Sequence, residues 1–390
     1  MLTHVKVRDK IEQGMRNLKD IITRWLLYKI QDINRKTAWA NELKRRLGLW
    51  RLADAIFVKK VDLRTKQHIL DSLREDIVSE KVAQLSAQGV DNPLFVVLHV
   101  ERLGDLIAAE PISRYLKKIA PKGRIRWVVK KAFCDVLAFN PYIDEVIEVD
   151  NLSQGEDYCR GVINDSNTVF VNCVFHRTAC PVTNRIFPNE NNPLITIFTY
   201  YAIGSLLETA SLAAGLPRLT DAPQFHFRKD VRLPAELEGR SYVVFHCFSN
   251  DISRDWGKDK WRELADYISS KGFLVVEIGE KRALEERPGM ILCLTGRRNI
   301  QDLACVVKNS RCFLGIDSGF AHVANATRRP SVIIVGRYGN FTGQSIWSGD
   351  FAKSNRFKVV RAPGEELASA IDIEVVKDAF DELLTLETSK

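Results

Sequence analysis

Residues 315–336 constrain the fold of this chain more than any other stretch of its sequence. They read GIDSGFAHVANATRRPSVIIVG, and the apolar run that ends at residue 316 leads directly into Asp-Ser-Gly at 317–319. A helix-compatible segment follows, and after Pro330 a second apolar run, 331–335, ends at another glycine. This order of strand, short turn, helix and strand is that of a crossover between parallel strands. It predicts an α/β fold with a helix N-terminus at the carboxyl ends of the strands.

The turn inside this crossover suits a nucleotide phosphate. Gly319 has no Cβ to block a close approach, and the free amides of the first helical turn point toward an anion. His322 lies about one helical turn further on, within reach of the same phosphate as a donor. The alternative is an ordinary strand–helix turn in which Asp317 caps the helix. Asp317, Ser318, Gly319 and His322 are therefore candidate phosphate-binding residues.

Length and composition indicate a soluble protein with more than one core. At 390 residues the chain exceeds a typical single core, so two domains and an appendage are expected. No apolar run reaches the roughly 18 residues of a membrane span, and no secretory signal is visible at the N-terminus. The eight cysteines are dispersed without a CxxC pair, which indicates free thiols in the cytoplasm. Cys173, His176 and Cys180 have no evident fourth ligand, so no metal is expected.

The excess positive charge lies in the first 90 residues. They hold 19 lysines and arginines against 11 acidic residues, whereas the remainder is balanced. Apolar residues recur at spacings of three or four through residues 11–33, which predicts amphipathic helices over residues 1–88. These helices either pack on the body with solvated cations or associate with an anionic membrane surface, and the two interpretations are compatible. The same bias would also be compatible with nucleic acid, a partner we do not expect.

From Pro93 onward, apolar runs alternate with helical patterns. The first half contains four predicted strands, near residues 94–100, 125–129, 145–149 and 168–174, and helices at about 106–119, up to 140 and at about 195–214. A proline-containing connection spans residues 217–239. The second half begins with a strand at 242–247, a helix at about 260–271 and a strand at 273–278, and a final helix spans 373–386. The predicted domains are 1–88, 89–220, 221–372 and 373–390.

Two further loops occupy places where a two-half α/β protein builds its site. In the first, Gly104 permits a tight turn, and Asp105 begins a helix that faces the cleft between the halves. A carboxylate there could deprotonate a hydroxyl, although it could instead be a helix N-cap. In the second loop, 246–256, Ser249 and Arg254 offer hydroxyl and guanidinium donors for a diphosphate without a metal. The alternative for that loop is a polar surface loop anchored by Trp256.

The three loops together resemble glycosyltransferase family 9, the bacterial heptosyltransferases. No Walker motif or GxGxxG fingerprint is present, which argues against a P-loop ATPase or a typical NAD enzyme. The resemblance covers roughly residues 93–386. It rests on RLGD at 102–105 before a helix with Pro111, FNPYIDEVIEVD at 139–150, SRDWGKDKWREL at 253–264 and DSGFAHVANATRRPSVIIVG at 317–336.

The resemblance implies a GT-B fold, in which two Rossmann-like doubly wound domains face a cleft, here with an added N-terminal helical extension. It implies a general base at Asp105, with Arg102 and Gly104 in the acceptor loop. For the nucleotide-sugar donor it implies Ser249, Arg254, Glu280, Asp317, Ser318, Gly319 and His322. It implies no metal and no cofactor beyond the donor substrate, ADP-heptose.

The predicted function is therefore an inverting glycosyltransferase of the cytoplasm or the inner face of the membrane. Its heptose would go to a lipopolysaccharide core, another glycan or a lipid-linked acceptor. Alternatives are a protein-directed heptosyltransferase, a sugar-nucleotide 2-epimerase of similar architecture, and a non-catalytic module that binds lipid or nucleic acid. The chain departs from the family in its first 90 residues and at Arg254, where lysine is common. These departures leave the acceptor and the donor sugar open.

Overall fold

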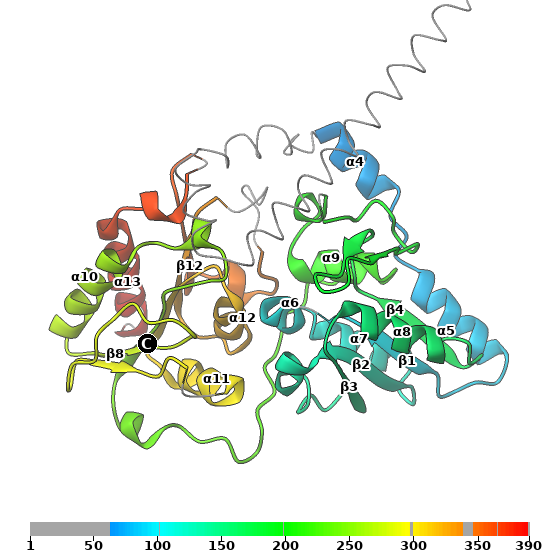
Figure 1. Cartoon of the computed structure of the whole chain (residues 1–390), viewed down its shortest axis with the longest axis horizontal. Coiled ribbons are helices and arrows are strands. Elements are labelled where there is room, and N and C mark those ends of the chain that lie inside the picture. The colour runs from blue at the N-terminus through cyan, green and yellow to red at the C-terminus, as the bar shows by residue number, and fades with distance from the viewer. Residues whose placement is uncertain are drawn as a thin grey trace, which may run out of the picture. The chain divides into compact units, whose positions relative to one another are not determined.

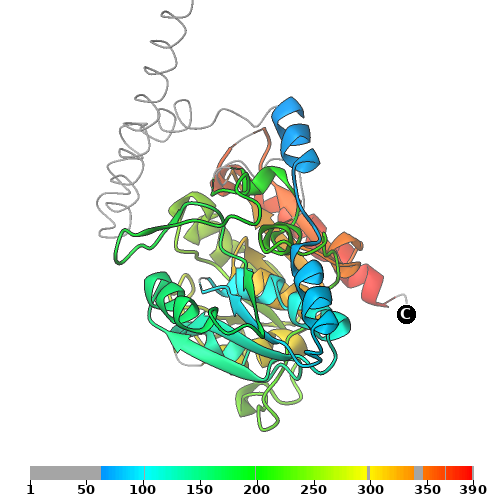
Figure 2. The same cartoon turned by 90° about the vertical axis from the view of Figure 1, so that its right-hand side faces the viewer.

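The computed structural model describes residues 63–100, 102–197, 199–296, 299–337, 346–364 and 366–388. Residues 63–390 form a compact unit of their own. Most of the predicted basic extension, residues 1–62, lies outside the described residues. Its last part contains helices α4 (Leu63–Asp71) and α5 (Ile77–Ala87), which precede the first strand along the chain and are blue in Figure 2.

The first half is built on a four-stranded parallel sheet (Figure 1). Its strands are β1 (Leu94–Leu98), β2 (Arg124–Lys130), β3 (Glu145–Val149) and β4 (Thr168–Asn172), in the order β3-β2-β1-β4. Apolar side chains such as Phe95 and Val97 are fully buried, as expected for strands covered on both faces. Helix α5 packs on β4 and α8 (Leu152–Val162) packs on β1, so α5 contributes to the core of this half.

The helices of this half differ from the sequence-based expectation. The single helix predicted over 106–119 is two helices, α6 (Leu103–Ala108) and α7 (Pro111–Ile119), because Pro111 lacks the N–H that would continue the hydrogen-bond ladder. The helix predicted over 195–214 is only α9 (Leu206–Ala213), which begins at a capping box formed by Ser205. The helix predicted before residue 140 is a short 3₁₀ segment, Lys131–Val136, and α8 was not predicted.

The second half contains a six-stranded parallel sheet. Its strand order is β12-β11-β10-β7-β8-β9. The strands are β7 (Tyr242–His246), β8 (Leu274–Glu277), β9 (Ile291–Cys293), β10 (Cys312–Ile316), β11 (Ser331–Val335) and β12 (Phe357–Arg361). Its helices are α10 (Lys258–Ser270), α11 (Ile300–Asn309), α12 (Gly319–Ala326) and α13 (Ile373–Thr388). The predicted crossover at 312–335 is confirmed as β10, α12 and β11.

Both sheets reverse their strand order beside their first strand. In the first half the reversal falls between β1 and β4, and in the second it falls between β7 and β10. Ligands of open α/β sheets bind outside the carboxyl ends of the strands at such reversal points. The loops that follow β1, β7 and β10 are those that hold the candidate site residues, so the fold places all three at reversal points. The predicted α/β class with two parallel sheets is confirmed.

The two halves share apolar packing next to these loops. One continuous cluster of buried side chains includes Val97 and Ile107 from the first half and Phe320 and Ile333 from the second. Helices α6 and α12 are in direct contact within it. Among the helices of the described residues, none is long and apolar enough to cross a membrane.

Candidate active site

The loop after β1 turns sharply into helix α6. Arg102 is the N-cap residue of α6 and has φ 67° and ψ 128°, in the region that favours glycine. Such a backbone conformation costs on the order of 1–3 kcal/mol and persists where the surrounding structure enforces it. Asp105 lies inside the first turn of α6 and is half-buried. The alternative in which Asp105 is the N-cap is therefore wrong, because the helix starts two residues earlier.

The loop after β10 brings two predicted site residues together. Asp317 is buried, and its Oδ2 lies 3.6 Å from Nη1 of Arg254. The same Nη1 donates a hydrogen bond of 3.1 Å to the carbonyl oxygen of Asp317. Ser318, not Asp317, is the N-cap residue of α12, and its side chain makes no capping hydrogen bond. The alternative in which Asp317 caps the helix is therefore wrong, because its carboxylate faces Arg254.

Two glycines let the N-terminal turns of α6 and α12 touch. A Cβ on Gly104 would lie 2.7 Å from Cδ2 of His322, and a Cβ on Gly319 would lie 2.7 Å from Cδ2 of Leu103. Both distances are shorter than real Cβ contacts, so a side chain at either position would push the two helices apart. The structure thus places the turn that holds Asp105 against the turn that begins α12.

Positive charge gathers around Asp317. Burial raises the pKa of the Asp317 carboxyl, and the nearby charges of Arg254, Arg361 and Arg102 oppose that rise. Three guanidinium groups near one carboxylate leave an excess of positive charge, which favours a diphosphate. Sequence reasoning missed Arg361. The available signal was that an apolar run, FKVVR, ends in a cation at the carboxyl edge of the parallel sheet.

Three buried histidines at the same sheet edges are neutral. Burial lowers the pKa of His99 and of His246 to about 4 and that of His322 to about 3. At neutral pH each imidazole can therefore donate one hydrogen bond and accept another without carrying charge. Nδ1 of His322 and Oγ of Ser318 are buried and have no hydrogen-bond partner in the described part of the chain. Polar atoms left this way are destabilising unless a ligand satisfies them.

The loop after β7 is held by its own hydrogen bonds. Ser249 Oγ donates to the carbonyl oxygen of Asp251 at 2.8 Å and accepts from the Asp251 amide at 3.0 Å. The Ser249 amide donates to Oδ1 of Asp255 at 3.3 Å. Trp256 is 1% exposed and donates its indole N–H to the carbonyl of Ile371. It therefore anchors the loop, as the alternative of a polar surface loop predicted. The role of Ser249 toward a donor stays a prediction.

Asp255 makes the stability of this loop depend on pH. Burial raises the pKa of its carboxyl to about 6, partly offset by the Ser249 hydrogen bond. Because this folded-state pKa lies above the unfolded value, the folded protein holds an extra proton between about pH 4 and 6. The free energy of unfolding should therefore fall as the pH rises through that window. Asp255→Asn is expected to flatten this dependence in urea titrations from pH 4.5 to 7, and an unchanged slope would contradict it.

The remaining candidates are Glu280 and the group of Cys173, His176 and Cys180. Glu280 is exposed in the loop after β8, directly behind Gly279, whose positive φ of 118° forms the turn. Its role toward a ribose stays a prediction. The described residues contain no group of three or more His, Cys, Asp or Glu side chains placed to hold a metal ion. His176, which was considered as a ligand, has Nδ1 within hydrogen-bond distance of the backbone of Asn189.

Solved glycosyltransferase structures share this architecture. The chain matches the crystal structure of the glycosyl transferase family 9 from Veillonella parvula DSM 2008 with a TM-score of 0.56 at 18% identity, over 75% of this chain and 97% of that one. It matches the E. coli ADP-heptose lps heptosyltransferase II with a TM-score of 0.55 at 16% identity, over 75% and 99% of the two chains. The fold is therefore GT-B, with two Rossmann-like domains.

The sequence comparisons point to the same family as the motifs. Residues 196–345 match the model of glycosyltransferase family 9 (heptosyltransferase). Lipopolysaccharide heptosyltransferase 1 of Pseudomonas aeruginosa is 21% identical over 279 residues, which cover 62% of this chain and 78% of that protein. Both matches support a heptosyltransferase-like glycosyltransferase related to family 9, the family that the motifs resemble.

Proposed function

We propose that this protein transfers a heptose from ADP-heptose to a lipopolysaccharide-core or other surface-glycan acceptor. The observation that carries the proposal is the contact between α6 and α12 at Gly104 and His322, which joins the turn of Asp105 to the cationic turn after β10. The heptosyltransferase relatives support the sugar, and the name of the E. coli structural neighbour supports the ADP-linked donor.

In the proposed reaction the acceptor hydroxyl attacks the anomeric carbon in line with the departing diphosphate. The new C–O bond forms as the bond between the anomeric carbon and the phosphate oxygen breaks, so the configuration inverts. Asp105 accepts the hydroxyl proton as general base. The binding energy of both substrates is used to align the hydroxyl with the carbon.

The leaving nucleoside diphosphate would be stabilised by the residues around Asp317. Arg254 and Arg361 supply positive charge, and the first amides of α12 beyond Gly319 point toward the anion. Ser318 and neutral His322 bring buried polar atoms that a phosphate or sugar oxygen can satisfy. Because guanidinium groups can neutralise a diphosphate, we propose that transfer needs no divalent metal.

A membrane-proximal location follows from the acceptor. The proposed acceptor is lipid-linked, and the basic residues of the first 90 positions suit an anionic membrane surface. We therefore propose that the enzyme works in the cytoplasm, at the inner face of the membrane. The part of the predicted extension ahead of α5 would add affinity for that surface without taking part in the transfer.

A thermal-shift screen with ADP-, UDP-, GDP- and dTDP-sugars tests the proposed donor. A ligand that binds only the folded state stabilises it by about 2.7 kcal/mol at 100 times its Kd, so one nucleotide series should raise the melting temperature selectively. ADP-heptose is expected to give the largest shift. Equal shifts for all four bases, or a larger shift with another base, would contradict the proposed donor.

A further inference from the structure

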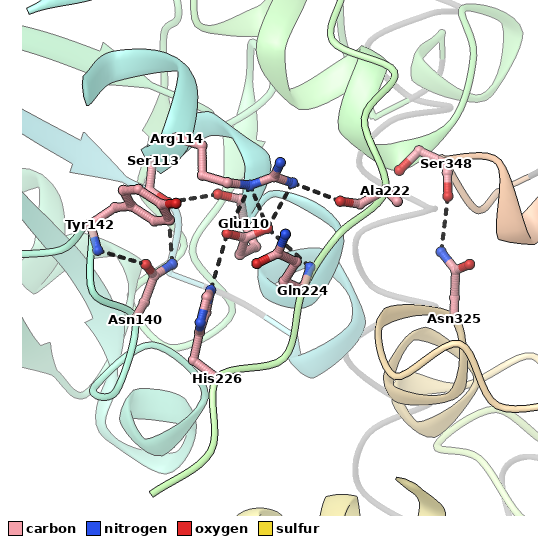
Figure 3. Close-up of polar contacts among 10 residues, drawn as sticks. All are labelled: Glu110, Ser113, Arg114, Asn140, Tyr142, Ala222, Gln224, His226, Asn325 and Ser348. Atoms are coloured by element: carbon pink, nitrogen blue, oxygen red, sulfur yellow. Dashed lines mark hydrogen bonds and ion pairs between the residues drawn. The ribbon is translucent and has the colours of Figure 1, made fainter. Parts of the chain in front are cut away.

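The connection between the two halves is held at His226 by one buried side chain from each half. This residue lies in the irregular segment between α9 and β7. Its imidazole contacts Glu110, at the junction of α6 and α7, and its backbone carbonyl contacts Gln301 in α11. Figure 3 shows the Glu110 side of this arrangement.

Glu110 holds the connection from the first half. Glu110 is 2% exposed, and its carboxylate accepts hydrogen bonds from Nε2 of His226 at 3.2 Å and from the amide of Gln224 at 3.0 Å. Arg114, one turn further along α7, forms an ion pair with Glu110 at 3.1 Å and donates to the carbonyl of Ala222 at 2.6 Å. The buried carboxylate of Glu110 therefore holds Gln224 and His226 of the connection directly, and it holds Ala222 through Arg114 (Figure 3).

Gln301 holds the connection from the second half. Its side chain is fully buried, and Nε2 donates to the carbonyl of His226 at 3.2 Å and to the carbonyl of Asp135 in the first half at 2.7 Å. Its Oε1 accepts the amide of Arg228 at 3.0 Å. The amide group of Gln301 thus joins α11, the connection and the first half through three hydrogen bonds.

Glu110 is also close to the turn that holds the proposed base. Only Ala109 separates it from the end of α6, and the Ala109 amide donates to the carbonyl of Asp105 at 3.0 Å. Displacing Glu110 therefore displaces the helix whose first turn contains Asp105. On the other side, α11 contacts α12, whose first turn follows Asp317.

We propose that Glu110 and Gln301 are positioning residues that act through His226 to set the turn of Asp105 against the turn that begins α12. This inference rests on the proposed role of Asp105 as the base. Neither side chain is expected to touch substrate. Their function is to fix the relative placement of two loops that must meet within a fraction of an ångström for in-line transfer.

Glu110→Gln and Gln301→Met test this proposal with little change in side-chain volume. Turnover per folded molecule, measured as ADP release from ADP-heptose with acceptor, is expected to fall about 10- to 100-fold in each. The Kd for ADP should stay within about twofold, because neither residue lies in the donor turn. The double variant should lose less than the product of the two single losses, because both act through the same residue.

Glu156→Gln is the matched control. Glu156 is also a buried carboxylate of the first half with an ion pair to an arginine four residues later, Arg160, but within the described part of the chain it forms no ion pair with the connection. It should keep wild-type turnover. Hydrogen exchange should rise at the Gln224 amide in Glu110→Gln and stay unchanged in the control, a readout that does not depend on any activity.

The possible results of these experiments test the positioning role separately from the proposed transferase function. Wild-type turnover in both folded variants would overturn the positioning role, even if Asp105→Asn is inactive. A turnover loss equal to that of Glu156→Gln would overturn it as well, because that loss would reflect general destabilisation. If the wild type releases no ADP with any acceptor, the proposed function fails instead. Exchange at Gln224 would then still decide whether Glu110 holds the connection.

Discussion

Asp105→Asn is expected to lower turnover by about 10³-fold while leaving the affinity for ADP within about twofold, because general bases contribute roughly 10²–10⁴-fold to such rates. Asparagine preserves the size of the side chain but cannot accept the proton of the acceptor hydroxyl. Asp105 lies in the first turn of α6, on the opposite half from the cationic turn that follows β10. Its removal should therefore affect the chemical step and not the binding of the nucleotide.

The control for this variant is Asp259→Asn. Asp259 also lies in the first turn of a helix, α10, where a carboxylate interacts favourably with the helix dipole, but its side chain is 97% exposed. Steady-state kinetics and calorimetric titration with ADP separate the possible results. Near wild-type turnover in Asp105→Asn would show that Asp105 is not the base. A joint loss of turnover and ADP binding would indicate a structural role.

Arg254→Gln is expected to weaken the binding of ADP about 10- to 100-fold, since a hydrogen bond to a charged group contributes about 1.5–3 kcal/mol. The variant should also lower the free energy of unfolding, because it leaves the buried carboxylate of Asp317 without its nearest cation. Arg254→Lys should recover part of the charge effect. It cannot reproduce the planar guanidinium that contacts both the carboxylate and the carbonyl of Asp317.

Two further variants show whether the loss of ADP binding is specific to Arg254. Arg262→Gln removes a half-exposed arginine of α10 that forms an ion pair with Asp259, and it should leave ADP binding unchanged. Adding Asp317→Asn to Arg254→Gln should restore part of the lost stability, because it removes a buried charge that has lost its ion pair with Arg254, without restoring ADP affinity. Unchanged ADP binding in Arg254→Gln would contradict the assignment of this arginine to the diphosphate.

The strands could be predicted from the sequence because buried parallel strands are continuous apolar runs. The predicted bounds of β3, β10 and β11 agree with the structure, and β2 differs by one residue at each end. The helices were harder because tertiary contacts override local propensity. In α8, Gly155 interrupts the helical signal, yet it suits the close packing there, because a Cβ would lie 3.0 Å from side-chain atoms of Leu98 and Val100.

The candidate site likewise contains residues that a local sequence signal predicts and residues that only tertiary contacts bring in. Residues next to a glycine-containing turn after an apolar run, such as Asp105 and Asp317, could be identified because the turn itself is a local signal. The cation at the end of FKVVR was not enough to identify Arg361, because its position beside Asp317 depends on the neighbouring placement of β12 and β11. Glu110 and Gln301 are separated by 190 positions and meet only at His226, so no local pattern indicates that they act together.

The most direct measurement of the central claim is transfer from ADP-heptose to a heptose-free lipopolysaccharide core oligosaccharide, followed by mass spectrometry and NMR. The two-sided site predicts that the acceptor gains one heptose for each ADP released, that the anomeric configuration inverts, and that Asp105→Asn lowers the rate of product formation by about 10³-fold. A donor recovered unchanged with every acceptor tested would contradict the account. So would an epimer of the donor formed without any acceptor, which would indicate a sugar-nucleotide 2-epimerase.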